Sequence, residues 1–509
     1  MQTTAPRHAK IVVTLGPATD GIERELVRAG MDVARLNFSH GTPEEHARRC
    51  DAVRAAARAL GRWVAVMQDL PGPKIRAGAL ISGGPVSLAE NQIVSVVPGD
   101  GLGTAERIFT TYRHLVDDVK PGDPIWLDDG HIRLRVVEVT RGAVSARVEV
   151  GGLLGEHKGI NLPGVALSAP SLTETDHESL RFGLERLGAD YVALSFVRGA
   201  EDVVAAQRFV RESGARTPLI AKIEKPEAIE NIEEIMDVAD GVMVARGDLG
   251  IELGPENVPV AQKSIVQRAN SHGKPVIVAT QMLESMTREE IPTRAEASDV
   301  ANAVWDGADA VMLSGETAVG RHPVLVVETM GRIVRSAESA LRGKGYFLRR
   351  AREGRGRSYS AAITDAACIL ANDLHAKAIV GITQTGLTAH LLSGRRPHAP
   401  ILAFSPDARV CQRLALWWGV TPVHLERRPD LETSIEAMES HLVSSGAAAP
   451  GDPIVVTGAH PMKPGLHTNF VKYQRVREKR PGDNSSSGSG KPLEDVDLDS
   501  SGRTEQNSA

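Results

Sequence analysis

A series of eight short apolar runs, separated by helical patterns, is the feature that most constrains how this chain can fold. Each run is rich in Val, Ile and Ala and is continuously apolar rather than alternating, as expected for strands buried on both faces of a sheet. Eight strand–helix units are the number that closes a (β/α)8 barrel of the α/β class. An open doubly wound sheet is the alternative, but it would not require so regular a count. The runs are KIVVTLG from Lys10, MDVARLNFSHG from Met31, WVAVMQDLPGP from Trp63, YVALSFVR from Tyr191, LIAKIEKP from Leu219, GVMVARGDLG from Gly241, PVIVATQM from Pro275 and AVMLSGET from Ala310.

Other regions interrupt this series or follow it. We place the barrel in residues 1–71 and 171–345, interrupted by residues 72–170, where short alternating segments are punctuated by Gly and Pro. The interruption predicts a small β barrel inserted at the C-terminal face of the main barrel, where it could act as a lid. Residues 346–479 show a second α/β pattern and predict a further domain. Residues 480–509 are polar and rich in Gly and Ser, which predicts disorder.

Composition narrows the class of partner. The chain has 509 residues, a formal net charge of -5 and a pI near 6.4, so no overall basic field favours nucleic acid or anionic lipid. No run approaches the roughly 20 apolar residues that a membrane span needs, and MQTTAPRHAKIVVTLG lacks the apolar core of a signal peptide. The three cysteines, Cys50, Cys368 and Cys411, show no metal-ligand spacing. We therefore expect a reduced, cytoplasmic protein that acts on small molecules.

Charged and hydroxyl side chains gather at the ends of the predicted strands, where barrel enzymes build their sites. In LIAKIEKP, Lys222 and Glu224 lie two residues apart and therefore project from the same face of an extended strand. Taken singly, each polar residue has an ordinary explanation as half of an ion pair, a helix cap or a turn former. Taken together, they indicate a charged ligand at the barrel mouth. The strand ends present Arg35, Asn37, Ser39, His40, Asp69, Lys74, Arg76, Lys222, Glu224, Arg246, Asp248, Thr280, Gln281, Ser314 and Glu316.

The residue types specify this ligand further. Glu224 and Asp248, on neighbouring strands, form the small carboxylate set that Mg²⁺ prefers, with positions left for substrate oxygens and water. Arg35, Arg76 and Lys222 suit phosphate or carboxylate groups. No P-loop, kinase Gly-rich loop or dinucleotide fingerprint is present. The set favours a phosphoryl transfer that depends on positioning and cations, because that chemistry needs charge neutralisation more than a protein nucleophile.

Five long segments closely resemble the signature segments of pyruvate kinase. They are MDVARLNFSHG, KIEKPEAIENI, DGVMVARGDLGIEL, KPVIVATQMLESM and GADAVMLSGETAVG. The likeness extends from about Lys10 to Val476, and the predicted order of barrel, inserted β domain and C-terminal α/β domain is similar to that of the family. The resemblance implies transfer of the phosphoryl group of phosphoenolpyruvate to ADP, giving pyruvate and ATP in the last step of glycolysis. It also implies a homotetramer.

The resemblance implies a role for each residue at the mouth. Lys222 would stabilise the moving phosphoryl group and the enolate oxygen, and Arg35 would clamp the phosphate. Glu224 and Asp248 would hold Mg²⁺, for which Mn²⁺ could substitute, and a second Mg²⁺ would arrive with the nucleotide. The remaining assignments are Gly247, Asp248 and Thr280 in the pyruvyl pocket, Thr280 and Ser314 near the proton route, Asn37, His40 and Arg76 facing the nucleotide phosphates, and Asp129 of the lid pointing inward.

The chain departs from the family at its potassium site. K⁺ commonly binds at the positions of Asn37, Ser39, Asp69 and Leu70, and K⁺-dependent members carry Thr at the last position and Glu in GPEIR. This chain has Leu70 and GPKIR, so that Lys74 stands at the Glu position. Because a tethered ammonium can supply the charge of a bound K⁺, we expect turnover without K⁺. The alternative is that Lys74 is a solvent-facing residue with no such role.

Two further departures concern the nucleotide and the effector. The family often has lysines where this chain has Thr175 and Val319, which implies an altered contact with the nucleotide. TQTGLTAH, from Thr383, lies at a predicted strand-to-helix turn that could bind a phosphate. Members activated by fructose 1,6-bisphosphate often carry basic residues where Gln384 and Leu387 stand. A sugar phosphate, a nucleotide monophosphate or no effector at all therefore remain open.

Two other functions are compatible with parts of the pattern. A Mg²⁺-dependent lyase on a barrel would also stabilise a pyruvate enolate with a Glu and an Asp, but it would not need Lys222 together with Arg35 and a capping domain. A degenerate sensor that binds phosphorylated metabolites would predict erosion of the barrel residues, whereas all of them are present.

Overall fold

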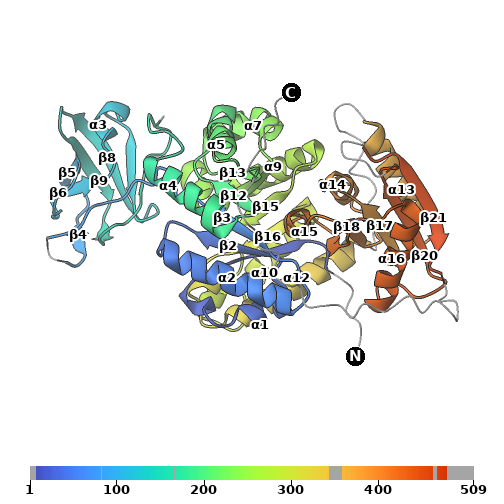
Figure 1. Ribbon diagram of the computed structural model, residues 1–509. Helices are drawn as coiled ribbons and strands as arrows, with labels where there is room; N and C mark the ends of the chain where they lie inside the picture. The colour runs from blue at the N-terminus through green and yellow to red at the C-terminus, as the bar shows by residue number, and fades with distance from the viewer. Residues whose placement is uncertain (1–6, 82, 166, 343–357, 462–466, 478–509) are drawn as a thin grey trace, which may run out of the picture.

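The computed structural model describes residues 7–81, 83–165, 167–342, 358–461 and 467–477. Its elements form a central barrel that lies between a β domain on one side and an α/β domain on the other (Figure 1). The C-terminal segment for which we predict disorder lies outside the described residues.

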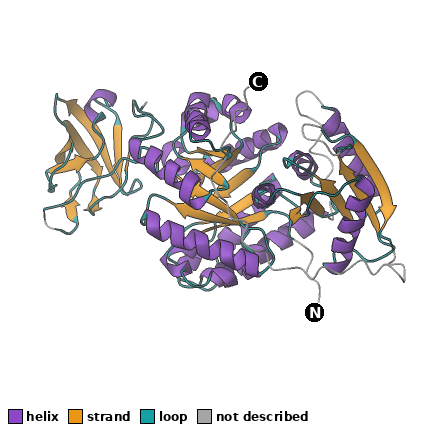
Figure 2. Ribbon diagram, in the orientation of Figure 1, coloured by secondary structure: helices purple, strands orange, loops and turns teal. Residues whose placement is uncertain are grey.

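Eight parallel strands close into a barrel, which confirms the predicted fold. Their order around the barrel is β1-β16-β15-β14-β13-β12-β3-β2. Alternate residues of each strand point inward and outward, so that the inner set packs within the barrel and the outer set packs against the surrounding helices. Figure 2 shows these helices around the barrel strands. The strands are β1 (Lys10–Thr14), β2 (Val33–Asn37), β3 (Ala65–Asp69), β12 (Tyr191–Leu194), β13 (Leu219–Ile223), β14 (Gly241–Ala245), β15 (Val276–Ala279) and β16 (Ala310–Leu313).

The helices of the barrel begin and end where their sequences favour it. At Thr42, Thr173 and Thr293 the threonine hydroxyl accepts from the third backbone N–H of the helix, while the acidic side chain there accepts from the threonine N–H. Gly273 and Gly307 end two helices in the left-handed conformation. The helical elements are η1 (Pro17–Thr19), α1 (Glu23–Ala29), α2 (Pro43–Ala59), α4 (Glu174–Phe182), η2 (Gly183–Leu187), α5 (Ala200–Glu212), α6 (Pro226–Glu230), α7 (Ile232–Val238), α8 (Arg246–Leu253), α9 (Val258–His272), η3 (Glu284–Thr287), α10 (Arg294–Asp306), α11 (Gly315–Ala318) and α12 (Pro323–Arg342).

An aspartate precedes every second strand of the barrel and makes the same pair of bonds each time. Its backbone N–H donates to the carbonyl of a residue at the start of the preceding strand, and its carboxylate accepts from the N–H of that same residue. The pairs are Asp32 with Ile11, Asp190 with Val66, Asp240 with Leu219 and Asp309 with Val276. Each pair of bonds fixes the register of two neighbouring strands at the amino end of the barrel.

The β domain follows β3 and precedes β12, so it is inserted at the carboxyl end of the barrel strands, as predicted. A six-stranded sheet, β11-β7-β8-β9-β5-β6, and a two-stranded sheet, β10-β4, enclose one apolar core. The elements are β4 (Val86–Leu88), β5 (Ile93–Pro98), β6 (Arg107–Thr110), α3 (Leu115–Asp118), β7 (Pro124–Leu127), β8 (Ile132–Val139), β9 (Val144–Val150), β10 (Gly152–Leu154) and β11 (Ile160–Asn161).

The C-terminal domain is a five-stranded sheet covered by helices on both faces (Figure 2). The strand order is β19-β18-β17-β20-β21, and only the last pair is antiparallel. Its elements are α13 (Tyr359–Asp373), β17 (Ala378–Ile382), α14 (Leu387–Gly394), β18 (Ile401–Ser405), α15 (Ala408–Leu414), β19 (Val420–His424), α16 (Leu431–Ser444), β20 (Pro453–Gly458) and β21 (Phe470–Arg475). None of the described helices is long and apolar enough to cross a bilayer.

The C-terminal domain closes the amino end of the barrel. Ala415 and Leu416, which follow α15, are buried in the same apolar cluster as the inner side chains of the barrel. The hydroxyl of Tyr191 donates to the carbonyl of Arg413 at 2.7 Å, and Lys10 Nζ donates to the carbonyl of Val420 at 2.7 Å. The opposite end of the barrel, where the inserted domain is attached, is therefore the end that carries the site.

Candidate active site

The ammonium of Lys222 lies at the centre of the barrel mouth. Its Nζ donates to Ser195 Oγ at 2.6 Å and lies 2.9 Å from Glu224 Oε1 and 3.2 Å from Asp69 Oδ1. All four side chains are buried and come from β3, β13 and the loops that follow β12 and β13. Burial by itself would lower the pKa of Lys222, but the carboxylates of Asp69 and Glu224 raise it above its ordinary value. The lysine therefore stays charged in a site that largely excludes water.

Arg35 extends this network toward the second strand. Its Nε donates to Asp69 Oδ2 at 2.7 Å, and its Nη1 donates to Thr14 Oγ1 at 2.9 Å. Burial would raise the pKa of Asp69, but Arg35 and Lys222 together hold it below its ordinary value. Asp69 thus fixes both cations in place, and two positive side chains face the mouth side by side.

Glu224 and Asp248 supply the carboxylates. The backbone N–H of Phe196 donates to Glu224 Oε2 at 2.7 Å. Burial raises the pKa of Glu224 and the nearby negative charge of Asp248 raises it further, while Lys222 opposes them. Glu224 Oε1 is buried, and its one partner among the described residues is the ammonium of Lys222 at 2.9 Å. Such an oxygen beside a second carboxylate fits a magnesium ion, which prefers few protein ligands and keeps positions for substrate oxygens. Within the described residues, no cluster of three or more acidic, His or Cys side chains offers a larger metal site.

The ends of β14 and β15 meet at the head of α8. The hydroxyl of Thr280 accepts from the N–H of Gly247 at 2.7 Å and donates to the carbonyl of Ala279 at 2.6 Å. Thr280 and Gln281 both have left-handed backbones, with φ of 69° and 51°. Each such non-glycine residue costs on the order of 1–3 kcal/mol, so the surrounding structure must hold it there.

Ser314 lies at the end of the eighth strand. Its Oγ is buried and has no hydrogen-bond partner in the described structure. The carboxylate of Glu316 accepts from the N–H of Ser314 at 2.6 Å and from the N–H of Leu283 at 3.1 Å. Glu316, which is fully buried, therefore fixes the loop that carries Ser314 against the loop that follows Thr280.

The loop after β2 carries the remaining predicted residues of that strand. Asn37 Oδ1 accepts from the N–H of Ser39 at 3.2 Å, and the imidazole Nε2 of His46 contacts the carbonyl of His40 at 2.9 Å. Partial burial lowers the pKa of His40, and the charges of Arg76, Lys74 and Arg35 lower it further. Arg76, Lys74 and Arg35 therefore lie close enough to His40 for their charges to act on its imidazole.

At the four positions where the resemblance implies K⁺, Leu70 is the one without a side-chain oxygen. Leu70 has a fully buried apolar side chain, and its carbonyl accepts from Ser195 Oγ at 2.7 Å. Asp69 already pairs with Arg35 and Lys222. The side chain of Lys74 is exposed, and its backbone N–H donates to the carbonyl of Gly72 at 2.7 Å.

A narrow cleft separates the barrel mouth from the inserted domain. Asp129 and Asn161 of the insert line it together with Lys74, Phe196 and Asp248. Asp129, which has a left-handed backbone, thus lies on the side of the insert that faces the barrel. A substrate held at Asp248 would be covered by this face.

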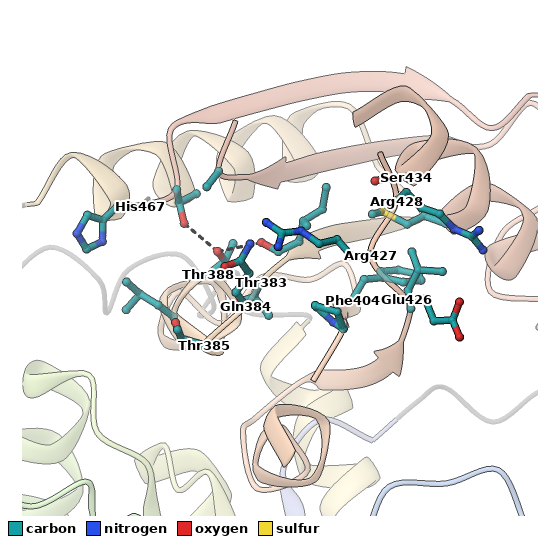
Figure 3. Close-up of a pocket in the computed structure, with 17 residues that line it drawn as sticks. Thr383, Gln384, Thr385, Thr388, Phe404, Glu426, Arg427, Arg428, Ser434 and His467 are labelled. Carbon is teal, nitrogen blue, oxygen red and sulfur yellow. Dashed lines mark hydrogen bonds between the residues drawn. The ribbon is translucent and has the colours of Figure 1, made fainter. Parts of the chain in front are cut away.

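A second, larger pocket lies in the C-terminal domain, at the turn between β17 and α14 (Figure 3). Its volume is about 160 Å³. Figure 3 shows the side chain of Arg427 extending toward Thr388, whereas Arg428 points away. The hydroxyl of Thr388 is hydrogen-bonded to that of Thr468 at 2.8 Å. The predicted strand-to-helix turn is confirmed, and the other polar residues around the pocket are Thr383, Gln384, Thr385, Glu426, Ser434 and His467.

Two contacts at the mouth involve residues that the sequence did not single out. Ser195 accepts from Lys222 and donates to Leu70, and Thr14 accepts from Arg35. Both are small hydroxyl residues at or just past the end of a barrel strand, where a residue that caps a helix would look the same. The only sequence signal was their position at the carboxyl end of a strand.

The fold and the site together define a class of protein. A closed (β/α)8 barrel with two cations and two carboxylates at its mouth, an inserted β domain and a C-terminal α/β domain is the arrangement of a barrel phosphotransferase. The family model described as "Pyruvate kinase, barrel domain" matches residues 6–327, and that described as "Pyruvate kinase, alpha/beta domain" matches residues 361–473. The chain belongs to the pyruvate kinase family and is a phosphotransferase.

Individual relatives agree with this assignment. A pyruvate kinase of Mycobacterium tuberculosis is 44% identical over 474 residues, which cover 93% of this chain and 99% of the relative. One from Geobacillus stearothermophilus is 43% identical over 480 residues, covering 93% of this chain and 81% of the relative. The crystal structure of a pyruvate kinase from Cryptosporidium parvum superposes with a TM-score of 0.86 at 35% identity, covering 92% of this chain and 96% of that one.

Proposed function

We propose that this protein transfers the phosphoryl group of phosphoenolpyruvate to ADP, giving pyruvate and ATP as the last step of glycolysis. The observation that carries the proposal is the buried ammonium of Lys222, held 2.9 Å from Glu224 and close to Asp248. Cations oriented in a site that excludes water stabilise developing negative charge far more strongly than they would in solvent. This arrangement suits a reaction in which charge moves from a phosphoryl group to an enolate oxygen.

The catalytic residues act in sequence on the substrate. Arg35 holds the phosphate of phosphoenolpyruvate, and Lys222 stabilises the phosphoryl group as its bond to the enolate oxygen breaks and its bond to ADP forms. Gly247 and Asp248 border the pyruvyl group. The enolate then takes a proton on its methylene carbon along a route lined by Thr280 and Ser314.

Glu224 and Asp248 would hold the divalent ion, Mg²⁺ or Mn²⁺. When bound, this ion neutralises charge on the phosphoryl and pyruvyl oxygens. The buried carboxylate of Glu224 supports this assignment, because its Oε1 has no partner other than Lys222 in the described structure and the negative charge of Asp248 acts on it.

The nucleotide would enter between the barrel and the insert. Asn37, His40 and Arg76 would meet its phosphates, and Asp129 would face the closed site from the lid. The lowered pKa of His40 supports a site that collects positive charge, since Arg76, Lys74 and Arg35 all act on this imidazole. The insert comprises residues 72–170 in the domain division that we propose.

The reaction and the role of Lys222 are tested together by a coupled assay. Pyruvate formation, followed with lactate dehydrogenase, should require ADP and Mg²⁺. Replacing Lys222 with Met should lower kcat by several orders of magnitude while phosphoenolpyruvate still binds. Pyruvate formation that needs no ADP would instead indicate a lyase, and a variant with nearly full turnover would refute the assigned role.

We propose that turnover does not require K⁺, because Lys74 replaces the cation. The lack of a side-chain oxygen at Leu70 supports this, as does the use of its carbonyl by Ser195. Activity should persist in a buffer whose only monovalent cation is tetramethylammonium. Loss of activity that K⁺ restores would show that Asn37, Ser39, Asp69 and Leu70 bind K⁺ after all.

For the C-terminal pocket we propose a small phosphorylated effector, either a sugar phosphate or a nucleotide monophosphate. The hydroxyls of Thr383, Thr385 and Thr388 and the inward side chain of Arg427 support a phosphate site there. We also propose a cytoplasmic homotetramer. The exposed apolar side chains of Tyr359 and Ile369 on α13 would suit a contact with a second copy.

A further inference from the structure

A single arginine contacts three successive carbonyls, from the last residue of β15 into the loop that follows it. Arg246 Nε donates to Ala279 O at 3.2 Å, and Nη2 donates to Thr280 O at 2.6 Å and to Gln281 O at 3.3 Å. The side chain keeps only 9% of its surface exposed. A guanidinium carries five donors in a rigid plane, so it can satisfy several carbonyls at once.

The carbonyls that Arg246 contacts belong to the strained part of the mouth. Thr280 and Gln281 are consecutive left-handed residues, and a β-branched residue such as Thr280 adopts that conformation rarely. A strained turn of this kind persists only where the surrounding structure over-determines it. Arg246 provides that constraint, because its donors fix the carbonyls on both sides of Thr280.

The arginine is itself braced from two helices. Its Nη1 donates to both carboxylate oxygens of Asp299 on α10, at 2.7 and 2.6 Å, and lies 3.4 Å from Gln262 Oε1 on α9. The guanidinium therefore joins the loop after β15 to the outer helices. Its donors are directed at the loop backbone, at the Sδ of Met282 in the same loop at 2.8 Å, and at Asp299 and Gln262, rather than at a substrate.

We propose that Arg246 is a positioning residue for the reaction: it locks Thr280 in the left-handed conformation that aims its hydroxyl at the head of α8. Through the bond between Thr280 Oγ1 and the N–H of Gly247, the same clamp fixes the position of Asp248. This inference rests on the proposed function, in which Thr280 lines the proton route and Asp248 holds the metal.

The test separates a clamp from a simple structural ion pair. Arg246→Met should lower kcat about 10- to 100-fold and change the KM for ADP by less than about 2-fold. Glycine adopts left-handed backbones without strain, so adding Gln281→Gly to this variant should recover part of the loss, about 5-fold or more. Arg246→Lys should fall between the wild type and Arg246→Met. The control is Arg268→Met, which removes a half-exposed arginine paired with Glu233 on neighbouring helices and should leave kcat unchanged.

A readout without catalysis keeps the clamp separate from the proposed reaction. Hydrogen exchange at the amides of residues 280–283 should speed up in Arg246→Met and not in Arg268→Met. If Arg246→Met does not fold, Asp299→Asn should replace it: exchange at the same amides should speed up, and kcat should fall about 3- to 10-fold. Unchanged exchange and kcat, or a loss that Gln281→Gly leaves untouched, would overturn the clamp. If the wild type showed no pyruvate kinase activity while Arg246→Met still showed faster exchange than Arg268→Met, the proposed reaction would be overturned and the clamp would stand.

Discussion

At the scale of single residues, the mouth is organised by charge balance. Lys222 and Arg35 supply two positive charges, and Asp69 and Glu224 supply two negative ones, all of them buried. Removing a charge from water is unfavourable unless a partner lies close, so each group depends on the others. The opposite pKa shifts of Asp69 and Lys222 follow from this dependence. A substrate anion that enters must compete with Asp69 and Glu224 for the same cations.

Ser195 is the residue in this network that most directly tests whether the orientation of the Lys222 ammonium matters for catalysis. It carries no charge but accepts from Lys222 and donates to Leu70 O. Because a hydrogen bond to a charged group contributes about 1.5–3 kcal/mol, we expect Ser195→Ala to lower kcat roughly 10- to 100-fold. The measurement is steady-state kinetics beside thermal unfolding, with Ser213→Ala, at the residue that follows α5, as the control. Wild-type kcat in Ser195→Ala would mean that Asp69 and Glu224 suffice to hold Lys222.

At the scale of elements, the repeated aspartates explain how alternate strands are joined. Three of them, Asp32, Asp190 and Asp309, are buried, and each also pairs with an arginine: Arg7, Arg54 and Arg396, respectively. Asp240 is exposed, and within the described part of the chain it makes only the backbone bonds. The difference is physical, since water can solvate an exposed carboxylate but a buried one requires a cation.

This difference predicts unequal costs for one substitution. Asp190→Ala removes a buried charge and leaves Arg54 without its carboxylate, so it should lower the free energy of unfolding by about 3–5 kcal/mol. Asp240→Ala removes one exposed acceptor and should cost about 1 kcal/mol. Urea unfolding of both variants measures the two losses in the free energy of unfolding and so checks their ratio. Equal losses would mean that the arginine pair adds nothing to the backbone bond.

The elements differ in how far the sequence could predict them. All eight barrel strands were predicted, because strands buried on both faces must be continuously apolar. β19 and β21 were both missed, since VTPVH and FVKYQR lie at the two edges of the sheet, mix polar with apolar residues and are partly exposed. The sequence placed Lys222, Glu224 and Asp248 at one mouth through their position at strand ends. It could not reveal the clamp by Arg246, which depends on contacts with residues 16 to 53 positions away in the chain.

At the scale of the whole molecule, Lys10 joins the barrel to the C-terminal domain. Its Nζ donates to Val420 O in a fully buried setting. Burial is the main cause that lowers the pKa of this ammonium from 10.5 to about 8, and Asp32 only partly opposes it. Between these two values the unfolded chain holds a proton at Lys10 that the folded protein lacks.

Stability should therefore respond to alkali in a defined direction. From about pH 8 to 10.5 the unfolded state binds more protons at this site, so Lys10 makes the free energy of unfolding rise with pH. The slope that it contributes is up to about 1.4 kcal/mol per pH unit. Comparing urea unfolding of the wild type with that of Lys10→Met across this pH range separates the contribution of Lys10 from that of other titrating groups. Parallel pH profiles for the two proteins would contradict the assignment.

The insertion of Leu416 among the inner side chains of the barrel has a consequence for protein engineering. A chimera that exchanged C-terminal domains between two relatives would also replace the residues that fill the amino end of the barrel. Such a chimera would need Ala415, Leu416 and their neighbours Met67 and Tyr191 to be transplanted as one set. A fragment that ended before residue 358 would instead expose the apolar inner side chains at the amino end of the barrel to solvent.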